Sequence, residues 1–567
     1  MKRTVSIGNQ DFESLRTEND FYIDKTDFIQ QWWDARDSVT LITRPRRFGK
    51  TLNMSMLNCF FSNRYENRGE LFEGLSIWHD ERFRKLQGTF PVIFLSFAGI
   101  KPSCYEVARK AINQQIADLY LSNIDLCQNK NSTDEDRAWF SKVNMEMGDA
   151  VAAVSLNKLC NWMQRCYGVK PLIFLDEYDT PLQEAYLGGY WDEMTSYIRN
   201  LFNNTFKTNP SLGRAIMTGI TRVSKESIFS DLNNLTVVTT TSDRYAACFG
   251  FTEAEVFQAL KEQGYGEDDQ AKVKMWYDGF TFGNKTDIYN PWSVTNYLKE
   301  GKLDTYWANS SGNGLISNLL RRGENELKVQ FEQLLVQGQI DVRLDEQIVF
   351  HSLDADPNAV WSLMLATGYL KVLSVQPLED AAYNEYPLYS LAITNLETRR
   401  LFEKMISGWF EKGGGLTRFA KVLLQGDLRG VNRYLNEMIL NSMSSFDGGM
   451  KPSEYKMPEN FYHGLVLGLL VESSGEYEIK SNRESGYGRY DAVMEPKDPA
   501  KPAVIMEFKV LDAEDGESTL EDTAANALKQ IEEKKYDTDL LSRGIPKENI
   551  LKYGFAFQGK SCLIRKA

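Results

Sequence analysis

The stretch "SVTLITRPRRFGKTLNMSMLNCFF", residues 38–61, decides the fold of the first half of this chain. It opens with a short β-branched run (38–43), which favours a strand, and closes with residues 50–61, whose apolar positions recur at helical spacing. Between them lies "RPRRFGKT" (44–51), which ends in the Gly-Lys-Thr of a phosphate-binding loop. A strand, a glycine-bearing turn and a helix in this order form the context that such a loop needs, so the stretch predicts a nucleotide site.

The residues of this loop have separate expected roles, because successive backbone N–H groups converge on phosphate oxygens at the start of a helix. Lys50 is expected to reach the β and γ phosphates, the Thr51 hydroxyl to bind Mg²⁺, and Gly49 to let the backbone come close. Arg44 takes the place of the usual first glycine, at a cost of about 1–2 kcal/mol if its φ must be positive. Pro45 stiffens the entrance to the loop and removes one donor there. The loop is altered but complete at its functional end.

A second acidic segment supports the nucleotide site. "PLIFLDEYD" (171–179) is a buried strand that ends in Asp176 and Glu177. Such a strand normally pairs beside the phosphate-loop strand, where its Asp holds Mg²⁺ and the next Glu, as a catalytic base, orients the attacking water. An acidic pair can also simply start a helix, since carboxylates favour helix N-termini. We expect Mg²⁺ on Thr51 and Asp176. The residues expected to bind ATP are Arg46, Arg47, Phe48, Gly49, Lys50, Thr51 and Asp176.

A third segment, "MTGITRVSKESIFSDLNNL" (217–235), ends another strand where a γ-phosphate sensor would lie. The hydroxyl of Thr218 or Thr221 can hydrogen-bond the phosphate, and Arg222 can neutralise charge that develops in the transition state. The alternative for Arg222 is a simply solvated side chain at a strand end. The sequence leaves both interpretations open.

The wider pattern predicts an α/β architecture. Short apolar runs at 90–97, 171–177 and 213–221 alternate with segments such as 105–120 that have helical periodicity. Strands buried on both faces and separated by helices indicate a parallel sheet with helical cover. From about residue 250 to 440 the strand signal fades, and we expect mainly helices there.

Aromatic turns interrupt this helical region at 276–284, 289–294 and 306–313. Tryptophans and tyrosines beside glycines usually lock a helical lid onto a core. A lid that closes over ATP would use the same contacts, so the sequence does not separate the two roles.

The last 120 residues carry a second set of charged residues. Asp491 begins one predicted strand (489–496), and Glu507 and Lys509 lie two apart on the next (503–510), so the latter two share a face. In a hairpin of these strands, Asp491 faces the end that carries Glu507 and Lys509. Two carboxylates can then bind Mg²⁺, with Lys509 polarising the attacking water or the scissile phosphate. The alternative is an exposed hairpin with solvated charges, but the strand around Glu507 is apolar, where charges need partners.

The motifs of the first 310 residues together resemble the bacterial AAA-ATPase-like family, in which an arginine-proline start of the loop is usual. Tyr22, Asp24 and Lys25 match a motif of that family, but no chemical role follows for them. Segments 361–373 and 389–405 resemble the winged-helix part of related archaeal ATPases. The motifs that carry the family resemblance are "FYIDKTDFI", "RPRRFGKT", "FLDEYD", "TGITRVSKESIFSDLNN", "WYDGF" and "YNPWSV".

The tail resembles the PD-(D/E)xK nuclease core in its order of helix, three strands, helix and strand. The resemblance implies a motif line of Asp491, Glu507, Lys509 and, on the following helix, Gln530, with Asp491 and Glu507 as metal ligands. Glu459 or His463, near the first helix, would complete the metal shell. The predicted elements are 460–472, 476–482, 489–496, 503–510, 519–535 and 550–557.

Composition limits the partners. The formal net charge of −13 argues against a broad basic face for nucleic acid, but a local site with acidic metal ligands is compatible with it. Apolar runs stay far below the roughly 20 residues of a membrane span, and the first residues do not form a signal peptide, so we expect a cytoplasmic protein without a membrane partner. Seven scattered cysteines and three histidines disfavour both a disulfide framework and a zinc site.

These observations predict four parts: a P-loop ATPase core with a parallel sheet (1–249), a helical lid (250–320), a helical or winged-helix-like middle region (321–447) and an α/β PD-(D/E)xK-like domain (448–567). The expected function is ATP binding and hydrolysis coupled to Mg²⁺-dependent cleavage of nucleic acid, with DNA favoured over RNA. The alternative is an ATP-dependent switch whose tail binds nucleic acid or a partner without cleaving it. A small-molecule kinase is a weaker third option, and assembly of identical chains is left open.

Overall fold

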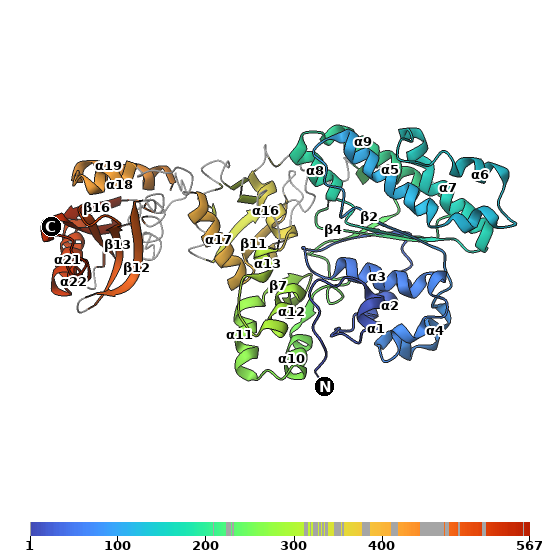
Figure 1. Ribbon diagram of the computed structural model, residues 1–567, viewed down its shortest axis with the longest axis horizontal. Coiled ribbons are helices and arrows are strands. Elements are labelled where there is room, and N and C mark those ends of the chain that lie inside the picture. Colours follow the sequence, from blue (N-terminus) through green and yellow to red (C-terminus); the bar gives the residue numbers. More distant parts are fainter. Residues whose placement is uncertain are drawn as a thin grey trace. The chain divides into compact units, whose positions relative to one another are not determined.

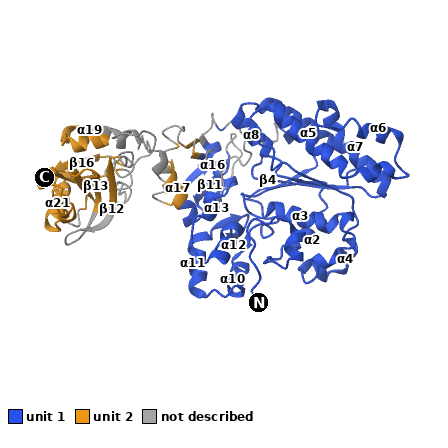
Figure 2. Cartoon of the chain, in the orientation of Figure 1, with its two compact units in different colours: residues 1–316, 341–399 blue, residues 317–340, 400–567 orange. Residues whose placement is uncertain are grey.

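The chain forms two compact units, each described by itself: residues 1–316 with 341–399, and residues 317–340 with 400–567 (Figure 2). The computed structural model describes residues 2–207, 209–222, 228–229, 232–310, 316–317, 319–320, 327, 330–331, 334, 338–344, 353, 357–376, 386–409, 418–442, 466, 470, 476–485, 488–512, 517–558 and 561–567.

The first unit is built on a five-stranded parallel sheet in the order β2-β3-β4-β1-β5. Strands β1 and β3 are buried at every position, which explains their continuous apolar sequences. The strands are β1 (Val39–Thr43), β2 (Val92–Ser96), β3 (Leu172–Asp176), β4 (Arg214–Gly219) and β5 (Leu235–Val238).

Helices cover both faces of this sheet (Figure 1). On one face lie α1 (Phe12–Thr17), α2 (Asp27–Ala35), α3 (Lys50–Phe61) and α4 (Glu81–Leu86). On the other face lie α5 (Tyr105–Leu121), α6 (Asp134–Phe140), α7 (Asp149–Tyr167), α8 (Thr180–Gly188) and α9 (Trp191–Phe202). The expected α/β fold class is confirmed. The expectation that β3 pairs beside β1 is wrong, because β4 lies between them.

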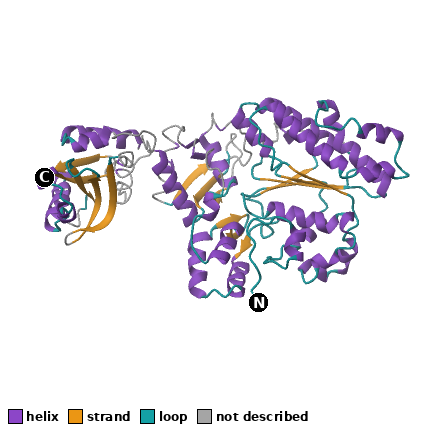
Figure 3. Cartoon of the chain, viewed as in Figure 1, coloured by secondary structure: helices purple, strands orange, loops and turns teal. Residues whose placement is uncertain are grey.

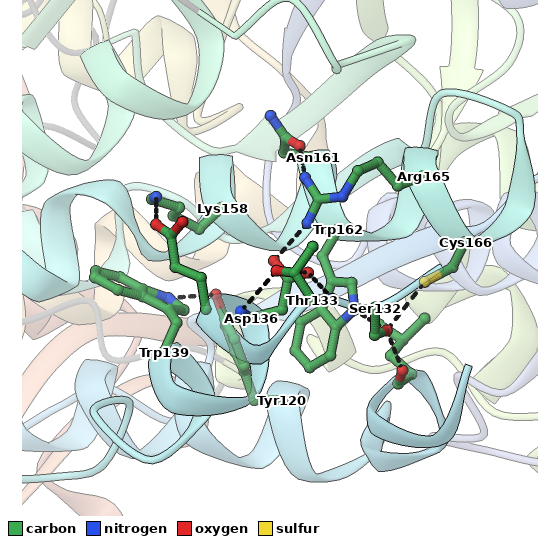
Figure 4. Close-up of polar contacts among 12 residues, drawn as sticks. Tyr120, Ser132, Thr133, Asp136, Trp139, Lys158, Asn161, Trp162, Arg165 and Cys166 are labelled. Atoms are coloured by element: carbon green, nitrogen blue, oxygen red, sulfur yellow. Dashed lines mark hydrogen bonds and ion pairs between the residues drawn. The ribbon is translucent and has the colours of Figure 1, made fainter. Parts of the chain in front are cut away.

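Polar contacts tie together the helices farthest from the phosphate loop (Figure 4). The indole N–H of Trp162 donates to the Ser132 hydroxyl at 2.6 Å, and that of Trp139 donates to the Tyr120 hydroxyl at 3.1 Å. Thr133 forms a capping box at the start of α6. These donors have partners inside the layer, so the cluster acts as internal support of the helical cover.

The motif of Tyr22, Asp24 and Lys25, which had no role from sequence, holds the amino-terminal segment in place. The ammonium of Lys25 lies 2.7 Å from both carboxylate oxygens of Glu255 and 2.9 Å from the carbonyl of Ala247. Glu255 belongs to the capping box of α10 (Glu253–Glu262). Asp24 accepts hydrogen bonds from the backbone N–H groups of Thr26 and Ser76. The motif is therefore structural in this unit.

The region after β5, which was predicted to be a helical lid, contains strands as well as helices (Figure 3). It contains α11 (Glu267–Tyr277), α12 (Pro291–Glu300) and α13 (Tyr306–Asn309). It also contains a small sheet of β6 (Phe251–Thr252), β8 (Lys285–Tyr289) and β7 (Phe280–Phe282), in this order. Strand β7 lies in the aromatic turn at 276–284, and β8 follows it. All three strands are too short to show an alternating pattern.

The middle region likewise contains strands where helices were expected. The elements are β9 (Gln339–Arg343), α16 (Pro357–Ala366), β10 (Leu370–Gln376), β11 (Leu388–Ile393) and α17 (Leu396–Trp409), with a sheet order of β10-β11-β9. Strands β10 and β11 are antiparallel. A helix followed by an antiparallel hairpin is the order of a winged-helix segment, and that assignment stays a prediction.

The second unit contains a five-stranded sheet in the order β12-β13-β14-β15-β16, antiparallel except for the parallel pair β14 and β15. The expected strands and the expected helix after them are present, and β16 is an addition. Of the predicted helix 460–472, only Val466 and Leu470 lie among the described residues. The elements are β12 (Tyr477–Ser485), β13 (Gly488–Pro496), β14 (Ala503–Val510), α21 (Leu520–Glu533), α22 (Thr538–Ser542), β15 (Ile550–Gln558) and β16 (Ser561–Lys566).

Two helices from the segment before residue 448 join this sheet: α18 (Arg418–Leu424) and α19 (Leu428–Ser442). Phe419 and Leu435 from these helices share a hydrophobic core with Phe508 and Phe555 of the sheet. The sequence assigns both helices to the middle region, and the four-part division as a whole stays a prediction. None of the described helices combines the length and apolar composition that crossing a bilayer requires.

Two asparagines of α19 cover the edge strand β16. The amide of Asn432 donates to the carbonyl of Ile564 and accepts from its N–H, both at 2.8 Å. Asn436 makes the same pair of bonds with Cys562, at 2.9 and 3.1 Å. Each side-chain amide therefore replaces the backbone of a neighbouring strand.

We expect the double variant Asn432→Ala, Asn436→Ala to lower the free energy of unfolding of this unit by about 2–4 kcal/mol, since donors and acceptors of β16 lose their partners. Thermal and urea unfolding measure the change. Arg429→Ala, at an exposed position of the same helix, is the matched control and should change stability little. Equal stability of the double variant and the control would contradict this role.

Candidate nucleotide and nuclease-like sites

The phosphate loop joins β1 to α3, and its strained position is not the expected one. The backbone is left-handed at Gly49 (φ 77°), which precedes the first residue of α3, and at Arg47 (φ 65°). Arg44 is not left-handed, so the expected cost of replacing a glycine there does not arise. Among the described residues, apart from those adjacent in the chain, no atom lies within 4 Å of the place where a Cβ on Gly49 would stand, so the loop is open at the start of the helix.

Arg44 instead has a structural role that the sequence did not indicate. Its side chain is fully buried and donates to the carbonyls of Thr43 at 2.9 Å and Thr239 at 2.6 Å. The guanidinium also lies 4.7 Å from the ring centre of Phe282. Burial lowers the pKa of Arg44 to about 10. The arginine thus joins the ends of β1 and β5 beside the loop entrance.

Lys50 is buried and turned onto the loop itself. Its ammonium donates to the carbonyls of Arg44 at 2.9 Å and Pro45 at 2.8 Å. Burial lowers the pKa of Lys50 to about 8, although the charges of Glu177 and Asp176 act in the opposite direction. The acidic segment after β3 and the phosphate loop therefore lie close together.

Asp176 connects three elements around this lysine. Its two carboxylate oxygens accept hydrogen bonds from the Thr51 hydroxyl of α3 at 2.8 Å and from the Thr218 hydroxyl of β4 at 2.6 Å. Asp176 is fully buried, and burial raises its pKa above the usual range. A buried carboxylate, a hydroxyl and an ammonium beside an open loop fit the phosphates and the Mg²⁺ of a bound nucleotide. Thr218, one of the two hydroxyls considered as a phosphate partner, donates to Asp176 here.

Glu177 and Asp179 follow at the same end of β3. Glu177 is partly buried with a left-handed backbone (φ 52°), which turns the chain sharply after Asp176. Asp179, which the sequence analysis did not single out, is buried and accepts from the backbone N–H groups of Ile220 at 2.9 Å and Thr221 at 2.8 Å. The hydroxyl of Thr221 also donates to Asp179, so the loop after β4 is fixed by this carboxylate.

The remaining expected ATP-binding residues divide into two groups. Arg46 and Arg47 are exposed, and the guanidinium of Arg47 stacks 4.3 Å from the ring centre of Trp292. Phe48 is buried, with its ring 4.7 Å from that of Phe280, so only its backbone can face a nucleotide. Arg222 is partly exposed and lines a small pocket with Thr43, Thr239 and the helix α16.

In the tail, the expected hairpin of β13 and β14 is present. Ala492 pairs with Met506, and continuing this register by one residue places Asp491 opposite Glu507. The Asp491 carboxylate accepts from the backbone N–H of Phe508 at 2.8 Å. Glu507 is buried and accepts a hydrogen bond from the side-chain amide of Gln530 on α21. Three of the four expected residues therefore lie close together where β13 and β14 approach α21.

Lys509, the fourth, has a neighbour that the sequence did not suggest. Against the effect of burial, hydrogen bonds from Asn526 and Thr523, at 2.7 Å each, lower the pKa of the Glu517 carboxyl, and the charge of Lys509 adds a smaller lowering. Tyr536 is a second missed residue: its buried hydroxyl accepts from Gln530 at 3.2 Å. Burial raises the pKa of Tyr536, and the charges of Glu507 and Asp491 raise it further, so the hydroxyl lies near both carboxylates.

A pair of carboxylates with oxygen ligands only is a donor set that suits Mg²⁺. The neighbouring amide and hydroxyl of Gln530 and Tyr536 can hold the carboxylate of Glu507 in place for a metal. Glu459 and His463, which were expected to complete the metal shell, lie outside the described residues.

Comparison with known proteins agrees with this geometry. Residues 6–229 match the family model described as predicted AAA-ATPase, and residues 457–567 match that of the PD-(D/E)XK nuclease superfamily. The chain is also 23% identical over 563 residues to an uncharacterized protein in the vnfD 5' region of Azotobacter chroococcum mcd 1, covering 96% of this chain and 95% of that protein. The chain is therefore similar to the predicted AAA-ATPase family over residues 6–229 and to the PD-(D/E)XK nuclease superfamily over residues 457–567.

Proposed function

We propose that this protein binds and hydrolyses ATP at the phosphate loop and cleaves phosphodiester bonds of nucleic acid, in a Mg²⁺-dependent reaction, at the tail site. The observation that carries the proposal is a group of acidic side chains at each place: the buried Asp176 beside Lys50 at the phosphate loop, and Asp491 opposite the buried Glu507 on neighbouring strands of the tail. We propose DNA rather than RNA as the substrate, and the ATPase segment as the control of the nuclease-like one.

At the nucleotide site, each residue has a role that its position supports. Lys50 exchanges the carbonyls of Arg44 and Pro45 for phosphate oxygens when ATP binds. Thr51 and Asp176 hold Mg²⁺, which neutralises phosphate charge. Glu177 orients the attacking water, and Arg222 neutralises charge that develops on the γ-phosphate.

At the tail site, Asp491 and Glu507 would hold Mg²⁺, which would supply a Lewis acid beside the scissile phosphate. Gln530 keeps the carboxylate of Glu507 in a fixed orientation. Lys509, with Glu517 nearby, is placed to stabilise charge on the scissile phosphate.

The test of the proposed cleavage uses the full chain with Mg²⁺, on single- and double-stranded DNA and on RNA, with and without ATP. We expect Asp491→Asn, Glu507→Gln and Lys509→Met each to lower cleavage at least about 100-fold, because each removes a metal ligand or the cation at the reacting phosphate. ATP hydrolysis should stay near the wild-type rate in all three variants.

Lys529→Met is the matched control for Lys509→Met, because Lys529 is an exposed lysine of α21 in the same unit. The binding-only alternative would be correct if the wild-type chain binds nucleic acid without cutting it and Glu507→Gln binds it equally well.

For ATP hydrolysis, we expect Glu177→Gln to keep ATP affinity within about threefold and to slow hydrolysis by about 10²–10⁴-fold, the usual contribution of general-base catalysis. Single-turnover hydrolysis and equilibrium ATP binding separate the two effects. Glu193→Gln, at an exposed position of α9, is the control. An unchanged single-turnover rate in Glu177→Gln would assign the base elsewhere.

ATP affinity should depend on pH through Lys50. The pKa of Lys50 is about 8 in the free protein, and bound phosphates raise it because they favour the ammonium. The affinity is therefore full below pH 8 and falls as pH rises from about 8 toward the pKa of the bound state. We expect the Kd for a fluorescent ATP analogue to be about tenfold higher at pH 9 than at pH 7.

Lys50→Met should bind ATP weakly at both pH values, because the ammonium is absent. The same tenfold change in Lys50→Met would show that another group causes the pH dependence.

A further inference from the structure

A phosphate loop has a requirement on its outer side. Its N–H groups turn toward the phosphates, so its carbonyls turn toward the protein and need donors there. The carbonyls of Arg44 and Pro45 accept from Lys50, which must leave them when it binds a phosphate. The carbonyl of Arg46 has a different donor: the indole N–H of Trp307, at 3.0 Å. The side-chain amide of Asn290 lies at 3.4 Å from the same oxygen.

Trp307 is held firmly enough to fix this carbonyl. Its side chain is 2% exposed, and its ring packs against Phe280 at 5.6 Å and Tyr369 at 5.3 Å between ring centres. Phe280 in turn contacts Phe48 of the phosphate loop. The indole therefore reaches the loop from within a packed aromatic group, with little rotational freedom.

The backbone of Trp307 is anchored by a carboxylate from a distant part of the chain. One oxygen of Glu397 accepts from the backbone N–H of Trp307 at 2.6 Å and of Ala308 at 3.2 Å, and the other accepts from the Ser293 hydroxyl at 2.8 Å. These N–H groups lie in the first turn of α13, which is only four residues long and cannot satisfy them internally. Glu397 is 1% exposed and belongs to the first turn of α17.

The part of the chain that precedes α17 also contacts the phosphate loop and the aromatic turns directly. A Cβ on Gly368, whose φ is +87°, would stand 2.8 Å from the ring of Pro45. A Cβ on Gly279, whose φ is +123°, would stand 2.1 Å from the carbonyl oxygen of Thr394. Both glycines permit close contact, so Gly368 packs against Pro45 of the loop, and Gly279 of the aromatic turns packs against Thr394 just before α17.

We propose that Trp307 and Glu397 form a positioning pair that holds the outer side of the phosphate loop and couples nucleotide occupancy to the first turn of α17. The pair rests on the proposed ATP site and adds a connection to it. When Lys50 turns to the phosphates, the Trp307 bond remains as the fixed point of the loop. Any shift of the Arg46 carbonyl then reaches Glu397 through the backbone of α13.

The charge state of Glu397 is compatible with this role. Burial raises the pKa of its carboxyl to about 7, against three hydrogen bonds that favour the charged form. A neutral amide can accept the same two N–H groups, so Glu397→Gln should preserve the connection. Glu397→Ala removes the acceptor and leaves the N–H groups without it.

The test compares the wild-type chain with Trp307→Phe, Glu397→Ala and Glu397→Gln. Trp307→Phe keeps an aromatic ring and removes the indole N–H. We expect its Kd for ATP to rise about tenfold, as the loss of the hydrogen bond to the Arg46 carbonyl predicts. Glu397→Ala should weaken ATP binding similarly, and Glu397→Gln should restore it to within about threefold of wild type. Trp78→Phe, a tryptophan stacked on Phe72, is the matched control.

Amide hydrogen exchange gives a second measurement, which a merely structural role would not change. In the wild type, ATP should slow exchange of the N–H groups of Trp307 and Ala308 at least about threefold. In Trp307→Phe, saturating ATP should leave the exchange of these amides unchanged. This arm also decides the question if Glu397→Ala fails to fold.

A wild-type chain that binds no ATP overturns the proposed nucleotide site and this inference with it. If the wild-type chain binds ATP, either of two results would overturn the inference alone. Trp307→Phe would bind ATP equally well, or ATP would slow hydrogen exchange of the two amides equally in both proteins.

Discussion

A loop that offers its N–H groups to phosphates must satisfy its carbonyls from the protein side, and much of the first unit follows from this constraint. Arg44 joins the carbonyl ends of β1 and β5, Lys50 covers two loop carbonyls, and Trp307 covers a third. An arginine in place of the usual first glycine is therefore an internal donor of the loop entrance. The aromatic turns that follow the sheet supply the remaining donor, which makes them part of the loop's support.

Buried carboxylates are the second organising feature. Asp176 and Asp179 lie in the interior, where burial alone would favour their neutral forms. Hydroxyl and backbone N–H donors from β4 and the loop after it offset that penalty. Because each carboxylate takes donors from neighbouring elements, the acidic end of β3 holds α3, β3 and β4 in one arrangement.

Local sequence patterns indicate the helices, strands and loop motifs better than they indicate which strands pair and which side chains meet. The phosphate loop and the acidic strand end were visible in local patterns, and so was the tail hairpin, because each depends on residues close in sequence. The insertion of β4 between β1 and β3 was not visible, since strand pairing is a long-range choice that local pattern does not encode. Asp179, Glu517 and Tyr536 were missed for a related reason: only the fold brings their partners to them. The sequence suggests only a conformational cost for the backbone of Arg44, whereas the hydrogen bonds of its buried side chain determine its role.

The asparagines of α19 have a consequence for how this chain can vary. Because Asn432 and Asn436 bind only main-chain atoms of β16, the exposed positions of that strand can change their side chains without losing these hydrogen bonds. The constraint is transferred to two positions of a helix more than 120 residues earlier in the chain. Relatives should therefore diverge at the exposed positions of the final strand, keep apolar residues at the buried positions of Cys562 and Ile564, and keep an amide at both helical positions. Because these asparagines occupy main-chain groups of the edge strand, they also keep a strand of another molecule from pairing with it.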